Sequence, residues 1–112
     1  MKKIEAIIRP EMFESVRDAL LKIGCQGLTV SEVEGHGKQK GLVQQWRGEK
    51  YQVYLLPKLK LEIVARDRDV ELIVRTIMDS AGTGQIGDGK IFVYDVSTAV
   101  RIRTGEKGEK AL

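Results

Sequence analysis

Residues 58–65 alternate between two kinds of side chain, and this pattern constrains the fold more than any other feature of the chain. The apolar positions are Leu59, Leu61, Ile63 and Ala65, and the positions between them are Lys58, Lys60, Glu62 and Val64. A period of two places successive side chains on opposite faces of a strand. The segment is therefore predicted to be a β-strand with one face packed on a core.

The first part of the chain reads as strand, helix and strand. Residues 2–9 alternate through an isoleucine-rich run, and residues 26–34 alternate less regularly. Pro10 suits the first turn of a helix, and Gly24 suits its end. Between them the apolar residues recur at helical spacing, at Met12, Val16, Ala19, Leu20 and Ile23.

The second part repeats the order. After the strand at 58–65, Asp67 or Asp69 is predicted to cap a helix that ends at Gly82. Its apolar stripe consists of Val70, Ile73, Val74, Ile77 and Ala81. Residues 91–96 are β-branched and aromatic and are predicted to form a strand. Two such units predict an α+β fold, the ferredoxin-like double βαβ, with an antiparallel sheet and both helices on one face.

The composition suits one globular domain spanning residues 1–112. Hydrophobic residues make up 42% and charged residues 31%, and the net charge of +3 does not argue for nucleic-acid binding. No apolar run is long enough to cross a bilayer, and the first residues do not resemble a signal peptide. Cys25 is the only cysteine and His36 the only histidine, which excludes an internal disulfide and fits a reducing cytoplasm.

Three segments fall outside the two units. The first is a long loop of about residues 36–56, which is expected to be flexible. It is far longer than a usual connection, and such loops are often functional. The second is the stretch 82–90, which is dense in glycine. The third is a polar C-terminal arm of about residues 101–112.

The stretch 82–90 is the most suggestive of these. Gly84 to Lys90 fits the first part of a phosphate-loop pattern, but Ile91 replaces the magnesium-binding Ser or Thr and a strand follows in place of a helix. An ordinary phosphate-loop NTPase is therefore rejected. Clustered glycines still let backbone amides converge on an anion, with Lys90 at the rim. The alternative is a plain turn, with Asp88 as a turn-forming residue.

The other two segments carry weaker signals. Two lysines lie among the glycines of residues 35–41, where a solvated loop is the alternative to an anion site. Arg101 and Arg103 alternate, so in an extended segment both would project from one side, toward a phosphate or a neighbouring subunit. Trp46, Arg47 and Tyr51 are residue types that anchor protein interfaces, unless the loop packs Trp46 on its own sheet.

No catalytic set can be assembled from these residues. A single histidine and a single cysteine leave no metal cage and no nucleophile with its base. A small phosphate-handling enzyme on this fold is one alternative function, although a fold alone does not license an activity. RNA binding on a ferredoxin-like sheet is another, but it relies on strand aromatics, and Phe92 and Tyr94 alone do not make that signature.

Several stretches together resemble the P-II nitrogen-regulatory proteins over essentially the whole chain. They are KKIEAIIRP, GLTVSEVEGHGKQKG, RGEKY, LLPKLKLEIV, TGQIGDGKIFV and RIRTGEKGE, in that order. The resemblance implies a homotrimer of ferredoxin-like subunits, with nucleotide bound in the clefts between them.

Site residues are implied by the same resemblance. Nucleotide, ATP or ADP, would contact Gly35, Gly37, Lys38, Gly87, Asp88, Gly89 and Lys90, with Arg101 and Arg103 of the adjacent subunit. Gln39 would help to hold Mg²⁺ and 2-oxoglutarate beside ATP, with Lys40, Gly41 and Lys58 also at the 2-oxoglutarate.

The implied function is a non-enzymatic binding switch. Mg-ATP completes a site for 2-oxoglutarate, the long loop reorganises, and partner proteins bind one state of the loop. Tyr51 matches a site of nucleotidylylation, and Arg47, with Trp46 beside it, matches the loop tip that contacts partners. The implied partners are an ammonium transporter, the only route to a membrane, or an enzyme or kinase of nitrogen metabolism.

Overall fold

The computed structural model describes residues 1–36, 42–46, 49–53 and 55–112, with the backbone alone for the two short middle ranges. The elements in chain order are β1 (Lys2–Ile8), the short 3₁₀ helix η1 (Pro10–Met12), α1 (Phe13–Lys22), β2 (Thr29–Gly35), β3 (Leu42–Trp46), β4 (Glu49–Val53), β5 (Leu56–Ala65), α2 (Asp67–Ala81), β6 (Lys90–Asp95) and η2 (Gly108–Ala111). Among the described residues, no helix has the length and apolar character needed to cross a membrane.

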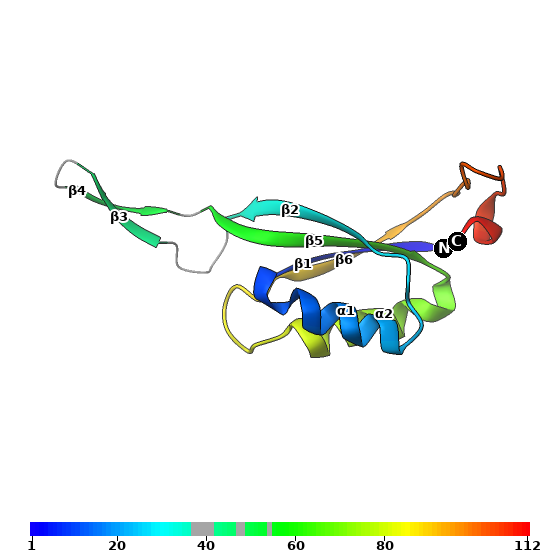
Figure 1. Cartoon of the computed structure of the whole chain (residues 1–112), viewed down its shortest axis with the longest axis horizontal. Helices are drawn as coiled ribbons and strands as arrows, with labels where there is room; N and C mark the ends of the chain where they lie inside the picture. The colour runs from blue at the N-terminus through cyan, green and yellow to red at the C-terminus, as the bar shows by residue number, and fades with distance from the viewer. Residues whose placement is uncertain (37–41, 47–48, 54) are drawn as a thin grey trace.

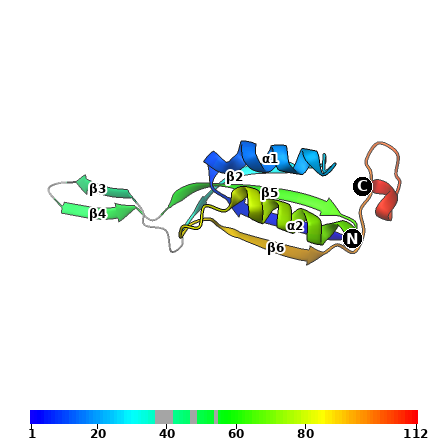
Figure 2. The same ribbon diagram turned by 90° about the horizontal axis from the view of Figure 1, so that it is seen from below.

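Four strands form the main sheet, in the order β2-β5-β1-β6. Each neighbouring pair is antiparallel. Both helices cover the same face of this sheet and lie side by side (Figures 1 and 2). The predicted α+β, ferredoxin-like arrangement is confirmed.

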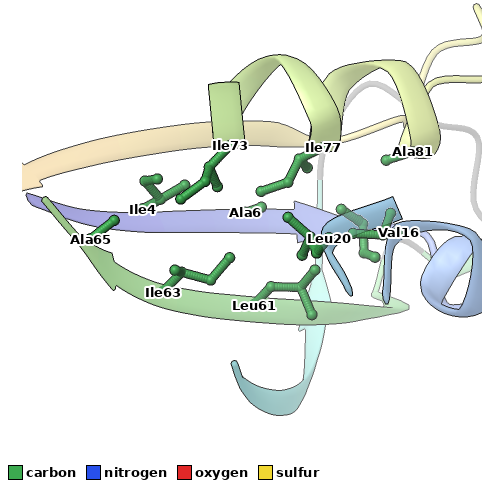
Figure 3. Close-up of a cluster of buried hydrophobic side chains, with 11 residues drawn as sticks. Ile4, Ala6, Val16, Leu20, Leu61, Ile63, Ala65, Ile73, Ile77 and Ala81 are labelled. Carbon is green, nitrogen blue, oxygen red and sulfur yellow. The ribbon is translucent and has the colours of Figure 1, made fainter. Parts of the chain in front are cut away.

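The core lies between the helices and the sheet, as Figure 3 shows. In β1 and β5 the buried residues are every second residue, so the alternation that predicted the strands also defines the buried face. The buried side chains are Ile4, Ala6 and Ile8 from β1, Leu61, Ile63 and Ala65 from β5, Val16 and Leu20 from α1, and Ile73, Ile77 and Ala81 from α2. Burial of this apolar surface provides the main stabilisation of the fold.

The first helix ends as the sequence predicts. Gly24 has a φ of 84°, and its amide donates to the carbonyl of Leu21 at 3.0 Å. The amide of Cys25 donates to the carbonyl of Leu20 at 3.0 Å, which completes a Schellman motif. Pro10 opens the 3₁₀ turn η1, so the α-helix itself begins three residues later than the proline.

The predicted cap of the second helix is wrong. Arg66 occupies the N-cap position, and neither Asp67 nor Asp69 caps the helix through its side chain. Asp67 is the first helical residue, and its carboxylate accepts a hydrogen bond of 2.5 Å from the N-terminal ammonium group of Met1. The carboxylate therefore ties the start of β1 to the start of α2, while its charge still suits a helix N-terminus.

The long connection between β2 and β5 contains a two-stranded hairpin. Strands β3 and β4 pair antiparallel, from Leu42 opposite Val53 to Trp46 opposite Glu49, in a sheet of their own (Figure 1). Strand β5 begins at Leu56, two residues before its predicted start, and so includes Pro57. Pro57 is accommodated because β1 ends opposite Leu59, which leaves β5 paired only with β2 there.

Candidate functional site

A cleft of about 510 Å³ opens where the end of β1, the base of the long connection and residues 82–90 meet. We refer to residues 82–89, between α2 and β6, as the glycine loop. The cleft brings together six residues that the sequence analysis predicted at the site: Gly35, Lys58, Gly87, Asp88, Gly89 and Lys90. These residues come from β2, β5, the glycine loop and the first position of β6, and the fold brings them to one cleft.

The glycines of this loop are required by its backbone. Gly84, Gly87 and Gly89 have φ values of 82°, 101° and 99°, which L-residues with a side chain rarely adopt. Gly89 also approaches β1 so closely that a Cβ atom there would lie 1.7 Å from the carbonyl oxygen of Ile7. The loop is therefore packed tightly against the end of β1.

Asp88 organises the loop from within. Its carboxylate accepts hydrogen bonds from the backbone amides of Thr83 at 2.8 Å and Gly84 at 2.9 Å, and from the Thr83 hydroxyl at 2.5 Å. The Arg9 guanidinium adds a 3.0 Å contact from Nε. These donors favour the ionised form and hold the pKa of Asp88 well below its ordinary value, with the Thr83 hydroxyl as the largest cause. The predicted turn-forming role of Asp88 is confirmed.

Basic side chains lie at the cleft beside the glycine loop. Lys58 Nζ donates to the carbonyl oxygen of Gly87 at 2.8 Å, and Lys90 lies on the wall of the cleft. Burial lowers the pKa of Lys58, and the nearby positive charge of Arg9 lowers it further. Cationic side chains beside a glycine-rich backbone make an environment suited to an anionic ligand.

Apolar side chains complete the cleft. Ile7, Leu56, Ile86 and Phe92 line it together with the polar residues His36 and Gln85. Sequence reasoning considered Phe92 only for base stacking and placed none of these residues at the site, because an isoleucine or phenylalanine in a strand is typical of ordinary packing. An apolar wall beside a glycine-rich loop with basic neighbours suits a ligand that has an apolar part and a negatively charged part.

Part of the predicted site lies outside the residues that the structure describes. This part comprises Gly37, Lys38, Gln39, Lys40, Gly41 and Arg47. Trp46 and Tyr51 lie in β3 and β4, for which the backbone alone is described. In the described ranges, no group of three or more His, Cys, Asp and Glu residues is arranged to hold a metal ion.

The arginine pair of the C-terminal arm lies at a turn, and not in an extended segment from which both side chains would project to one side. Arg101 begins a turn, closed by a 2.7 Å hydrogen bond from the amide of Gly105 to the Arg101 carbonyl. The Arg101 guanidinium donates to Glu106 and to the carbonyl of Leu112, each at 3.1 Å. The arm lies at the end of the sheet opposite the glycine loop (Figures 1 and 2), so within one chain Arg101 and Arg103 do not join the cleft.

Arg9 is the functional candidate that sequence reasoning missed. Its guanidinium contacts Asp88 and the carbonyl of Ile86, residues almost eighty positions away in the chain. A basic residue at the end of the predicted strand 2–9, directly before Pro10, was the only available signal, and it did not indicate a partner.

Comparison with known proteins identifies the chain. Residues 1–106 match the family described as Nitrogen regulatory protein P-II. The chain is 56% identical over its full length to Nitrogen regulatory protein P-II 2 of Methanothermobacter thermautotrophicus, covering 97% of that protein. It is 54% identical to Nitrogen regulatory protein P-II of Pasteurella multocida and 53% identical to Nitrogen regulatory protein P-II 1 of Escherichia coli K12, covering all of both proteins. The chain therefore belongs to the P-II family of nitrogen regulatory proteins and has a nitrogen-regulatory signalling role.

Proposed function

We propose that the chain senses adenine nucleotide and 2-oxoglutarate, with ATP or ADP bound at the glycine-loop cleft. The observation that carries the proposal is the convergence of Gly35, Lys58 and residues 87–90 on this one cleft. Gly87, Gly89 and Lys90 would receive the phosphates, while the apolar wall of the cleft would pack against the organic part of the nucleotide. The Asp88 carboxylate is already bonded to its own loop, so Asp88 would act through its backbone and through the shape of the loop.

The proposal includes a homotrimer. Arg101 and Arg103 lie at the opposite end of the sheet from the cleft, so they can reach a phosphate only in the cleft of a neighbouring subunit (Figure 1). The sheet face without helices supports an assembly, because it leaves Phe92 and Tyr94 43% and 45% exposed. Exposed aromatic residues are costly to leave in water and are common at interfaces.

Mg-ATP would complete a second site for 2-oxoglutarate. Lys58 would pair with a carboxylate of this ligand, because its ammonium group already stands at the cleft beside the glycine loop. Gln39 would help to hold Mg²⁺, and Lys40, Gly41 and the backbone around Gly37 and Lys38 would complete the site. Both ligands would then act on the same connection between β2 and β5.

The conformation of the connection between β2 and β5 would then determine which partner proteins bind. Arg47, Trp46 and Tyr51 would contact partner proteins, and Tyr51 would be the position of any nucleotidylylation. The partners would be an ammonium transporter, or an enzyme or kinase of nitrogen metabolism, in the cytoplasm. The family is one of regulatory signalling proteins, and the protein would act by binding, without catalysing a reaction.

Calorimetric titration of the purified protein with Mg-ATP and with Mg-ADP tests nucleotide binding, with Mg-GTP as the control for the base. Arg103→Ala should weaken ATP binding, whereas Arg68→Ala, an exposed arginine on α2, should not. Sedimentation should give three times the mass of one chain. Unchanged ATP affinity in Arg103→Ala, or a monomer that binds ATP normally, would contradict the cross-subunit site.

A further inference from the structure

We infer that Arg9 is a positioning residue for the nucleotide site, and that it acts through Asp88 and not by touching the ligand. The inference rests in part on the proposed function, because it assigns the glycine loop to phosphate binding. Arg9 directly follows β1, and its side chain is only 12% exposed. It is therefore held against the protein rather than extended into solvent.

The Arg9 guanidinium binds the glycine loop at two points. Nε donates to the Asp88 carboxylate at 3.0 Å, and a terminal nitrogen donates to the Ile86 carbonyl at 2.8 Å. Because the guanidinium is planar and rigid, two donors used in different directions fix the orientation of the loop as well as its distance from β1.

Asp88 carries this restraint to the rest of the loop. Its second carboxylate oxygen accepts from the amides of Thr83 and Gly84, which begin the loop. Gly89, next along the chain, packs on the carbonyl of Ile7 in β1. The loop is thus closed on itself by Asp88 and attached to the end of β1 by Arg9 on one side and by Gly89 on the other.

Removal of the Arg9 side chain should leave the glycine loop closed on itself but less firmly attached to β1. Asp88 would keep its bonds to Thr83 and Gly84, whereas the attachment to β1 at Asp88 and Ile86 would be lost. The amides of residues 87–90 would then have to be ordered when a phosphate binds, and ordering at that stage reduces affinity. The expected effect is a weaker nucleotide site in a protein that remains folded.

The first test is titration with Mg-ATP in the absence of 2-oxoglutarate. Arg9→Met should raise the Kd for ATP by about tenfold, the scale of the free energy needed to order the backbone of one residue when the ligand binds. Arg17→Met is the matched control, because Arg17 lies on α1, where its guanidinium donates to Asp18 and lies over the Phe13 ring, away from the glycine loop. The Kd of this variant for ATP should be unchanged. Arg9→Lys should not restore affinity, since an ammonium group cannot bridge Asp88 and Ile86 in the same way.

A double-mutant cycle separates this role from direct ligand contact. If Arg9 acts through Asp88, the double variant that combines Arg9→Met with Asp88→Asn should lose no more ATP affinity than the weaker-binding of the two single variants. If the fold-increases in Kd of the two single variants multiply in the double variant, Arg9 acts as a charge at the ligand, and the inference is overturned. Wild-type ATP affinity in Arg9→Lys would overturn it in the same way.

Amide hydrogen exchange without nucleotide gives a readout that does not depend on the proposed function. Residues 83–89 should exchange faster in Arg9→Met than in the wild type or Arg17→Met, with the core strands unchanged. Unchanged exchange in the loop would overturn the inference, even if the wild type binds ATP. Absence of ATP binding by the wild type would contradict the proposed function, and the exchange result would still decide the role of Arg9.

Discussion

The ammonium group of Lys58 donates a 2.8 Å hydrogen bond to the carbonyl oxygen of Gly87. This contact joins the start of β5 to the glycine loop, across the cleft that both line. A carboxylate that bound Lys58 would share the ammonium group with the Gly87 carbonyl, because this group has three N–H donors. The contact therefore gives a physical link between the two ligands of the proposed sensor.

Replacing Lys58 should affect binding of 2-oxoglutarate more than binding of ATP. Lys58→Met should weaken 2-oxoglutarate binding by at least tenfold, as expected for loss of a charged hydrogen bond, while ATP binding is largely retained. Lys60→Met is the matched control, because Lys60 lies two residues along β5 and forms an ion pair with Glu62. Equal loss of both ligands, measured by calorimetry in the presence of Mg²⁺, would argue against the assigned role of Lys58.

Gly89→Ala should be more damaging than Gly84→Ala. Both glycines have a positive φ, so alanine at either position costs about 1–2 kcal/mol of stability from backbone strain. At Gly84 a Cβ atom would meet nothing within 4 Å, whereas at Gly89 it would collide with the carbonyl of Ile7. Denaturant unfolding and ATP titration of the two variants should both rank Gly89→Ala as worse, and similar losses would contradict the close packing of loop and strand.

The contribution of Asp88 to stability should depend on pH. Its folded-state pKa lies below the unfolded value of about 3.9, so its ionised form stabilises the native state above that value. The contribution should disappear as the pH falls below about 4 toward the folded-state pKa. Thermal unfolding should therefore show wild type more stable than Asp88→Asn at pH 7, with a smaller difference at pH 3. A difference that is constant with pH would contradict the ionic network.

Two adjacent leucines of α1 provide a matched test of the core. Leu20 is 1% exposed between helix and sheet, whereas Leu21 is 53% exposed. Leu20→Ala should lower the free energy of unfolding by about 2–5 kcal/mol through lost burial and a residual cavity. Leu21→Ala should change it by less than about 0.5 kcal/mol. The variants should be compared at equal protein concentration, because an oligomer gains stability with concentration.

Local patterns were sufficient for most of the fold. The alternation in β1 and β5 and the helical spacing in α1 and α2 each depend on which residues face one core, and that is visible in a short stretch of sequence. The glycines of residues 84–89 and the turn-forming role of Asp88 were also visible, because a positive φ restricts residue type.

Contacts between distant residues were not predictable in this way. Aspartate is a residue type that often caps a helix, but in this fold the carboxylate of Asp67 binds the N-terminal ammonium group of Met1. Arg101 and Arg103 alternate as in a strand, but the bond from Gly105 to Arg101 makes a turn. The sequence around Arg9 does not indicate that Asp88 is its partner, because the antiparallel pairing of β1 with β6 brings the two residues together.

The central claim is that the two ligands bind in order at one connected site, and calorimetric titration with 2-oxoglutarate tests it most directly. The titration is run on the purified protein alone, with ATP, with Mg²⁺, and with both ATP and Mg²⁺. Heat of binding is expected only when both are present, because in the proposed mechanism Mg-ATP completes the site beside Lys58. Binding of 2-oxoglutarate without nucleotide, or no binding under any of these conditions while ATP binds normally, would contradict it.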